Sequence, residues 1–407
     1  MRTMKDSGIK WIGQIPESWG VWRMKHLAKS PLQYGANATG IEFDPDLPRY
    51  IRITDITPDR KLSNDGKQSL PENIAKDFLL ENEDLLFARS GATSGKSFFY
   101  NDSYGKCCFA GYLIRFRADG RKANSRFLYY YTLTRAYEYW TQEIFIQATI
   151  QNISAEKYDN LVFAIPSSLD EQKRIVEYLD SKCSEIDTLI AAKEKTNALL
   201  RERRQSIIYE AVTKGLDPSA PMKDSGVEWI GKIPTTWNTI RAKHVAAISN
   251  GSDPRTEGDT PVYGSGSESF RTCGEFKEGP AVLIGRKGAT LHIPHYVEGK
   301  YWNVDTAFDV KTNEAVFLLK YYYYAAICFD YKLYISTTTL PSMTQTNYGN
   351  MYLPFPVVEE QKQIVNHIEK TILQIDQLIT NYKASIQKLK EYRQSLIFEA
   401  VTGKIEV

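Results

Sequence analysis

The sequence predicts an α+β protein organised as an internal repeat: two mixed α/β domains, separated by two long helices that pair as an antiparallel coiled coil. The first observation is a stretch at 171–213 that contains neither Pro nor Gly and returns without a gap at 360–402. The second is an opening segment, MKDSGIKWIGQIP at 4–16, which returns as MKDSGVEWIGKIP at 222–234. Both halves of the chain therefore follow one plan, and a pseudo-twofold repeat is the simplest arrangement.

The first domain is expected at 1–168, and it begins with the opening segment. Short runs of β-forming residues alternate with turn residues, as in a mixed sheet. A helix rich in aromatic residues is expected at 125–139. The strand-like runs are 49–54, 84–89, 111–117 and 161–166.

The segment 169–215 is predicted to be the first long helix, because good helix formers dominate it and Gly215 is a natural residue to follow a helix end. Its apolar residues recur at alternating steps of three and four, which indicates the seam of a coiled coil. Polar Lys193, Asn197 and Arg204 interrupt this seam. The apolar seam residues are Val176, Leu179, Ile186, Ile190, Leu200 and Ile207.

The second half contains a domain at 216–358, with strands expected at 281–285 and 307–310 and a helix at 314–331, and then the second long helix at 359–407. The short proline-containing linker after Gly215 keeps this domain near the end of the first helix. The second helix must then run back, so the pair is antiparallel. Its seam residues are Val365, Ile368, Ile372, Ile375, Ile379, Ile386, Leu389 and Leu396.

The composition is that of an ordinary soluble protein, with 42% hydrophobic residues, 25% charged residues and a formal net charge of +2. The five cysteines form no paired metal spacing, so free thiols in a reducing cytoplasm are expected. His292 and His295 are spaced like two metal ligands, but no third ligand stands at a telling distance in sequence, and no metal is expected.

Each domain contains an Arg-x-Gly-Ala-Thr motif at a predicted strand end. In the first domain the motif extends to Gly-Lys-Ser and resembles a phosphate-binding loop, but three residues separate its glycines where that loop needs four. The second copy lacks Gly-Lys-Ser. The shared feature is an arginine on a tight turn, which suits contact with a phosphate or a guanine edge; a solvated surface turn is the alternative. The candidate DNA-binding residues are Arg89, Thr93, Lys96, Arg286, Lys287 and Thr290.

A polar loop follows the aromatic helix in each domain, at 147–154 and 336–347. Amide side chains can bind adenine through two hydrogen bonds, and hydroxyl groups can contact either member of a base pair. The alternative is an ordinary polar surface loop. The candidate residues here are Gln147, Thr149, Gln151, Asn152, Thr337, Thr338 and Gln345.

The four repeated motifs, in this order, resemble the DNA-specificity subunit of type I restriction-modification systems. They are Trp-Ile-Gly-x-Ile-Pro at 11–16 and 229–234, and the Glu-Gln-Lys-x-Ile-Val helices with their Arg-Gln-Ser-x-Ile-x-Glu-Ala-Val-Thr ends at 204–213 and 393–402. The resemblance implies that each variable domain is a target recognition domain for one half of a split, asymmetric DNA site. It also implies that the helices set the gap between the half-sites.

The resemblance further implies partners: two modification subunits, which use S-adenosylmethionine, and restriction subunits, which use ATP and Mg²⁺ for translocation and cleavage. No cofactor is expected in this chain. The sequence has no Asn/Asp-Pro-Pro-Tyr/Phe methyltransferase motif and no complete phosphate-binding loop, so a non-catalytic subunit is expected. The alternatives are a nucleotide-driven ATPase or nuclease that uses 91–97, and a coiled-coil scaffold without a DNA role.

Overall fold

The computed structural model describes residues 2–91, 93–146, 152–266, 268–335 and 341–407. Two compact units are formed: unit 1 contains residues 1–192 and 385–407, and unit 2 contains residues 193–384. Each long helix gives about half of its length to each unit. None of the helices among the described residues combines the length and apolar character needed to cross a bilayer.

Unit 1 contains two four-stranded sheets. The first is antiparallel and has the order β4-β11-β8-β9, and the second has the order β10-β6-β7-β5 with β10 and β6 parallel. The strands of the first sheet are β4 (Gln33–Tyr34), β11 (Leu113–Phe116), β8 (Leu85–Ala88) and β9 (Ser97–Phe99). Those of the second are β10 (Cys107–Phe109), β6 (Arg49–Ile51), β7 (Gln68–Ser69) and β5 (Ile41–Glu42).

Two antiparallel strand pairs and several short helices also belong to the described part of unit 1. The strand pairs are β1 (Met4–Asp6) with β2 (Gln14–Pro16), and β3 (Trp19–Arg23) with β12 (Val162–Pro166). The helices are α1 (Met24–Leu27), α2 (Glu72–Ala75), α3 (Ser125–Tyr131), α4 (Arg135–Ile146) and α5 (Ala155–Asp159).

Unit 2 repeats the first sheet strand for strand, in the order β16-β23-β20-β21, and its second sheet again contains one parallel pair, β17 with β22. The first sheet consists of β16 (Ala246–Asn250), β23 (Ala307–Thr312), β20 (Ala281–Gly285) and β21 (His295–Val297). The second consists of β18 (Ser269–Cys273), β17 (Thr260–Tyr263), β22 (Lys300–Asn303) and β19 (Lys277–Glu278). The remaining elements are β13 (Met222–Asp224), β14 (Lys232–Pro234), β15 (Asn238–Arg241), β24 (Tyr352–Phe355), α7 (Leu319–Cys328) and α8 (Gln345–Asn350).

The aromatic helices differ from the sequence prediction. The single helix predicted at 125–139 is two helices, α3 and α4, and the helix predicted at 314–331 is confined to 319–328. The break in unit 1 falls at two threonines, where Thr132 donates to the carbonyl of Tyr129 and Thr134 to that of Tyr131. Such side-chain bonds to the backbone compete with helix continuation, and two successive ones end α3.

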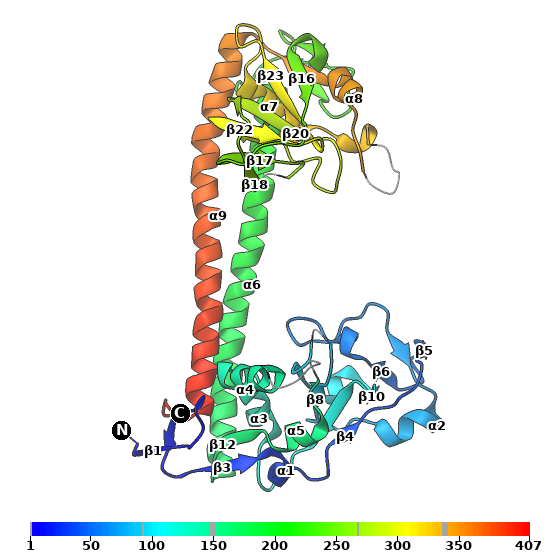
Figure 1. The fold of residues 1–407 in the computed structure, drawn as a ribbon, viewed down its shortest axis with the longest axis vertical. Helices are drawn as coiled ribbons and strands as arrows, with labels where there is room; N and C mark the ends of the chain where they lie inside the picture. Colours follow the sequence, from blue (N-terminus) through cyan, green and yellow to red (C-terminus); the bar gives the residue numbers. More distant parts are fainter. Residues whose placement is uncertain (1, 92, 147–151, 267, 336–340) are drawn as a thin grey trace. The chain divides into compact units, whose positions relative to one another are not determined.

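The long helices are α6 (Leu169–Lys214) and α9 (Val358–Val401). In unit 1 the first half of α6 lies beside the last half of α9, and in unit 2 the relation is reversed, so the pairing is antiparallel within each unit (Figure 1). α6 ends before Gly215, whose φ of 74° is the left-handed conformation expected of a residue that follows a helix.

The seam of the coiled coil is buried at most predicted positions. Leu200, Ile207 and Leu389 are only half-buried. Near the end of α6 the fully buried residue is Ile208, not Ile207, because here α6 packs on the core of unit 2 as well as on α9. The buried predicted seam residues are Val176, Leu179, Ile186, Ile190, Val365, Ile368, Ile372, Ile375, Ile379, Ile386 and Leu396.

Arginines that interrupt the seam form ion pairs between the two helices. Arg204 on α6 lies 2.9 Å from Asp376 on α9, and Arg393 on α9 lies 3.0 Å from Asp187 on α6. The two pairs are equivalent under the repeat, and each lies within one unit. At these two arginines the interruption of the heptad pattern therefore joins the two helices through an ion pair.

The Glu-Gln pair at the start of each long helix attaches the α/β domain. The carboxylate of Glu171 accepts a hydrogen bond from the indole of Trp19, and that of Glu360 accepts one from Trp237. The buried amide of Gln361 accepts from the backbone N–H of Leu318 and donates to two backbone carbonyls, and Gln172 makes the equivalent contacts in unit 1. The repeated motif thus fixes each long helix to its neighbouring domain.

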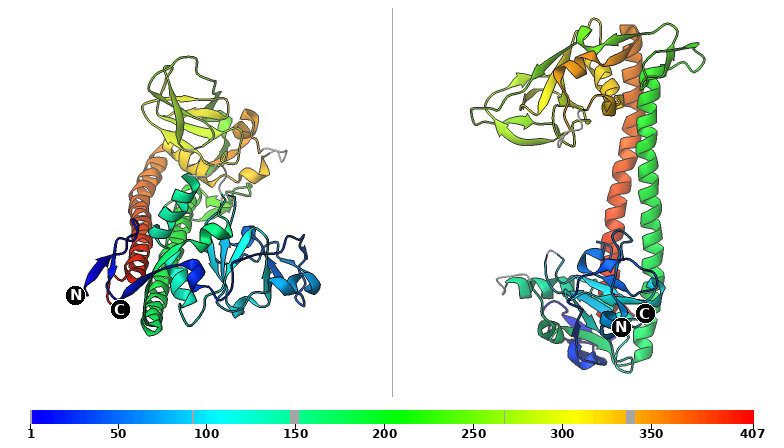
Figure 2. Two further views of the ribbon diagram at one scale, coloured as in Figure 1. Left: turned by 60° about the horizontal axis from the view of Figure 1, so that its bottom comes forward. Right: turned by 90° about the vertical axis from the view of Figure 1, so that its right-hand side faces the viewer.

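Both ends of the chain lie in unit 1 (Figure 2). Arg2 contacts Glu171 at 2.6 Å and Glu406 at 3.6 Å. A Cβ atom added to Gly403 would lie 2.4 Å from the ring of Pro16, so the segment after α9 packs closely on the opening segment.

Candidate nucleic-acid interface

The two Arg-x-Gly-Ala-Thr turns occupy equivalent places in the two units. Arg89 follows β8 and begins the connection to β9, while Arg286 follows β20 and begins the connection to β21. The N–H of Arg89 donates to the carbonyl of Tyr112, 3.0 Å away, and that of Arg286 to the carbonyl of Thr306, 2.7 Å away. Each arginine is therefore held at the end of its strand by a hydrogen bond to the turn that precedes the neighbouring strand, β11 in unit 1 and β23 in unit 2.

In both units this turn lies next to the polar loop that the sequence selected independently. The N–H of Ile153 donates to the carbonyl of Arg89 at 2.8 Å, and the N–H of Met343 donates to that of Arg286 at 2.9 Å. The two candidate segments of each domain thus form one surface. The candidates Gln147, Thr149, Gln151, Thr337 and Thr338 lie outside the described residues.

In unit 1 the arginine is flanked by two tyrosines that the sequence analysis did not select. The guanidinium of Arg89 lies over the ring of Tyr34, with 4.8 Å to the centroid, and Tyr112 is 62% exposed on the adjoining turn. The Nε atom of Arg89 and the Oδ1 atom of Asn152 have no hydrogen-bond partner among the described residues. Both atoms are buried, so what the site presents at its surface is an arginine beside two aromatic side chains.

The site in unit 2 has a different chemical character. Arg286 donates to the carbonyl of Asp305 at 3.3 Å, and Lys287 is exposed beside it. Thr290 shares a 3.3 Å hydroxyl contact with Ser265. The exposed side chain of Gln345 donates one amide N–H to the carbonyl of Ile248.

Lys96 is also turned towards the protein. Its ammonium donates to the carbonyl of Thr57 at 3.1 Å, and burial, reinforced by Arg60, lowers the pKa of this lysine. Ser97 begins strand β9, whereas a phosphate-binding loop must lead into a helix. The half-buried Thr93 accepts the N–H of Lys96 at its own carbonyl and so shapes this turn. The geometry argues against the nucleotide-binding alternative.

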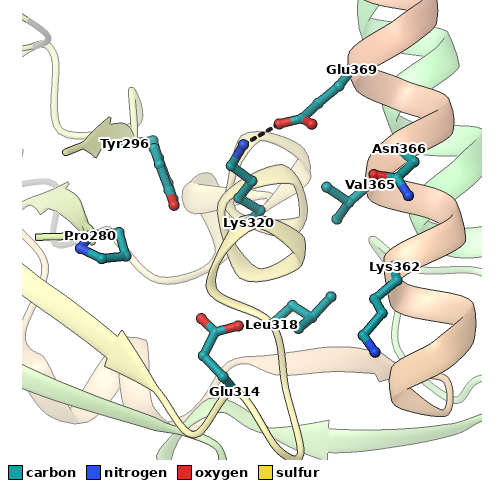
Figure 3. Close-up of a pocket in the computed structure, with 9 residues that line it drawn as sticks. All are labelled: Pro280, Tyr296, Glu314, Leu318, Lys320, Lys362, Val365, Asn366 and Glu369. Carbon is teal, nitrogen blue, oxygen red and sulfur yellow. Dashed lines mark hydrogen bonds and ion pairs between the residues drawn. The ribbon is translucent and has the colours of Figure 1, made fainter.

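A second kind of repeated feature lies between the aromatic helices and the long helices. In unit 2 a hollow of about 470 Å³ separates α7 from α9, and the ion pair of Lys320 with Glu369 lies at its edge (Figure 3). In unit 1 a hollow of about 390 Å³ contains the corresponding pair, Arg126 with Asp180 at 2.9 Å. Each hollow is lined both by residues of the α/β domain and by residues of the long helices, and neither Arg89 nor Arg286 is among the lining residues.

Two α/β domains with the same strand order in their first sheets, each with an arginine turn beside a polar loop and each fixed to long paired helices, define a class of two-domain proteins built by internal repetition. The family described as type I restriction modification DNA specificity domain matches residues 46–199 and 234–388. The chain belongs to this family and contains two copies of its domain.

Individual relatives agree with this assignment. The chain is 22% identical to the type I restriction enzyme MjaX specificity subunit of Methanocaldococcus jannaschii, over 97% of this chain and 96% of that relative. It is 25% identical to the type I restriction enzyme StySPI specificity subunit of Salmonella potsdam, over 53% of this chain and 47% of the relative. These relatives favour a DNA-specificity role over a nucleotide-driven enzyme.

Solved structures share the fold. A chain from a structural study of complex assembly and conformational transition of the type I R-M system has a TM-score of 0.74 and 15% identity, with 96% of this chain and 99% of that chain covered. The HsdS subunit from Thermoanaerobacter tengcongensis has a TM-score of 0.52 and 16% identity, with coverages of 96% and 98%. The internal repeat predicted from the sequence is thus the architecture of this family.

Proposed function

We propose that this chain is the non-catalytic DNA-specificity subunit of a type I restriction-modification complex, and that it reads a bipartite, asymmetric site with one half per unit. One observation carries the proposal: an arginine turn bonded to a polar loop occurs at the same place in both units, with unlike neighbouring side chains. Equivalent position supports a common role, and unlike chemistry supports different sequences.

Each arginine turn is suited to contact a base edge in the major groove. A guanidinium forms two parallel hydrogen bonds to guanine, and stacking on Tyr34 restricts the orientations open to Arg89. At the corresponding place in unit 2 the guanidinium of Arg286 lies over the buried ring of Phe308, 5.9 Å from the centroid, and donates to the backbone carbonyl of Asp305, whereas the ring of Tyr34 in unit 1 is exposed. Two readers with these unlike surroundings would select unlike half-sites.

The long helices would set the gap between the half-sites and bind two modification subunits. A helix of 46 residues, the length of α6, extends about 69 Å at roughly 1.5 Å per residue. Leu189 on α6 and Leu378 on α9 are equivalent under the repeat, and they are 51% and 46% exposed. A framework that presents the same apolar group twice suits two copies of one partner.

The remaining chemistry would belong to other chains of the complex. S-adenosylmethionine would be bound by the modification subunits, and ATP and Mg²⁺ by the restriction subunits, while this chain would hold no cofactor. Because its substrate would be double-stranded DNA, the complex would act in the cytoplasm.

The test is a selection of bound duplexes from a random pool, with the full chain co-expressed with its modification subunit. The expected consensus is two unlike short blocks separated by a fixed unread gap. Arg89→Ala should relax one block and Arg286→Ala the other, each by about 1–3 kcal/mol in discrimination. A single contiguous block, or loss of both blocks in either variant, would contradict one reader per unit.

A further inference from the structure

The outer part of the second sheet of unit 2, strands β17 and β18, is called the β17–β18 arm here, although β17 also pairs with β22; the sequence motifs did not indicate this element. β18 is the edge strand of its sheet and pairs only with β17 among the described residues, and the register shifts at Val262 and Tyr263. Four successive residues of β18, 269–272, are exposed. Since neighbouring residues of a strand face opposite sides, exposure of all four means that neither face of the strand is covered.

The exposed strand nevertheless displays a large aromatic residue. Phe270 is 60% exposed, and the guanidinium of Arg271 lies over its ring, 5.3 Å from the centroid. Arg271 also pairs with the exposed carboxylate of Asp253 at 2.7 Å. Aromatic residues and arginines are enriched among the residues that contribute most to binding at interfaces: the ring gains by leaving water, and the guanidinium can exchange its present partner for one on the ligand.

The arm is continuous with the arginine turn of unit 2. Ser265 contacts Thr290 of that turn. A Cβ atom added to Gly264 would lie 3.0 Å from the hydroxyl of Thr306 and 3.7 Å from the ring of Phe270, so both side chains border this glycine. Thr306 accepts the N–H of Arg286. A short series of contacts therefore joins Phe270 to the candidate base-reading arginine.

We propose that the β17–β18 arm is a further DNA-contacting element of unit 2, in which Phe270 contacts base edges in the major groove and Arg271 binds a backbone phosphate. The inference rests on the proposed function and assigns residues to it. A two-stranded β ribbon fits the major groove, and an apolar side chain there contacts thymine methyl groups. On binding, Arg271 would exchange the carboxylate of Asp253 for a phosphate, which guanidinium also binds through two hydrogen bonds.

Unit 1 presents a related pair near the edge of its second sheet. There Lys67 lies over the ring of Phe43, 5.1 Å from the centroid, and Phe43 is partly exposed. A cation over an exposed phenylalanine thus occurs beside the second sheet of both units, although the strands around it differ. The arm of unit 2 is the clearer case because contacts connect it to the arginine turn.

A photo-crosslinking amino acid at position 270 tests the contact directly. The full chain, co-expressed with its modification subunit, would be irradiated with the duplex obtained by selection. A crosslink to the half-site read by unit 2 is expected. The matched control is position 352, because Tyr352 also lies under an arginine, Arg241, at 5.2 Å but on the sheet of β15 and β24; no DNA crosslink is expected there.

Titration of duplex binding against salt separates the two roles. Phe270→Ala should weaken binding about ten-fold without changing the slope of log K against log salt, since it removes an uncharged contact. Arg271→Ala should reduce the magnitude of that slope by about one, since it removes one phosphate contact. Arg241→Ala, the control, should change neither. Thermal unfolding of each variant should match the parent chain, because the substituted side chains are exposed.

Other outcomes would overturn the inference. If neither arm variant alters binding while Arg286→Ala does, the arm does not contact DNA and the proposed function stands without it. A crosslink from position 270 to a protein chain would likewise assign the arm to a protein partner. If the parent complex selects no duplex at all, the proposed function itself fails, and the arm fails with it.

Discussion

Replacing Gln361 with leucine should destabilise unit 2 without touching any candidate DNA contact. The fully buried amide of Gln361 accepts the N–H of Leu318 at 2.8 Å and donates to the carbonyls of Pro356 at 2.9 Å and Val316 at 3.2 Å. Leucine has a similar size but no polar atom, so the variant keeps the packing and removes all three hydrogen bonds.

The magnitude follows from these three partners. A hydrogen bond contributes about 1 kcal/mol net, and a buried backbone group left without a partner costs about 1–3 kcal/mol. The longest of the three bonds contributes least, and the gain from burying an apolar side chain offsets part of the loss. After this offset, the three backbone groups left without a partner should lower the free energy of unfolding of unit 2 by about 3 kcal/mol.

Urea unfolding of the full chain, followed by hydrogen exchange resolved by peptide, measures this loss unit by unit. Gln363→Leu is the matched control, because Gln363 is exposed on the same helix two residues further on; it should change stability by less than about 0.5 kcal/mol. Gln172→Leu should produce the same loss in unit 1. A Gln361→Leu chain as stable as the control would refute the role assigned to the repeated glutamines.

Four further outcomes are expected. Arg204→Glu should destabilise unit 2 by about 1 kcal/mol, and adding Asp376→Arg should restore most of this in a double-mutant cycle, since both side chains are partly exposed; no recovery would disprove the ion pair. A permutant with joined termini, opened within the 215–221 linker, should keep the parent unfolding curve and duplex binding, whereas failure to fold would contradict docking of the opening segment. A fragment of residues 1–215 should dimerise in sedimentation experiments and select a symmetric site; a strictly monomeric fragment would oppose antiparallel pairing. Hydrogen bonds from residues 255–256 lower the pKa of the Glu275 carboxyl to about 2. The stabilisation that this carboxylate gives to the 255–256 loop is therefore fully present above its ordinary pKa of 4.5 and is lost as the pH falls through about 2. Hydrogen exchange of that loop should rise over this range, and Glu275→Gln should remove the pH dependence.

The framework was predictable from the sequence because it rests on local periodicity and on repetition. A heptad pattern fixes which face of a helix is buried, and a second copy of the pattern identifies its partner. The end of α6 at Gly215 follows from backbone geometry alone. The burial of Ile208 in place of Ile207 was not predictable, because near its end α6 also packs on the α/β core. Tertiary packing overrides a heptad pattern at such a place.

The candidate interface was predictable only in part. The motifs located both arginine turns, but which loop lies beside each turn depends on backbone contacts between residues far apart in sequence, such as Ile153 with Arg89. Tyr34 and Tyr112 carry no motif, and only their exposure beside Arg89 marks them. Lys96 belongs to the most motif-like segment of the chain, yet it binds the backbone, because the strand after it turns the side chain inward.

The ion pairs between the long helices also affect how this chain can evolve. Asp187 faces Arg393, and Asp376 faces Arg204, so each pair joins one copy of the duplicated helix to the other copy. Loss of an acid from one copy leaves an arginine unpaired in the other. Substitutions at 187 should therefore be matched by substitutions at 393, rather than within the same helix. The duplicated helices would be inherited as an interdependent set, while the α/β domains would be free to diverge one at a time.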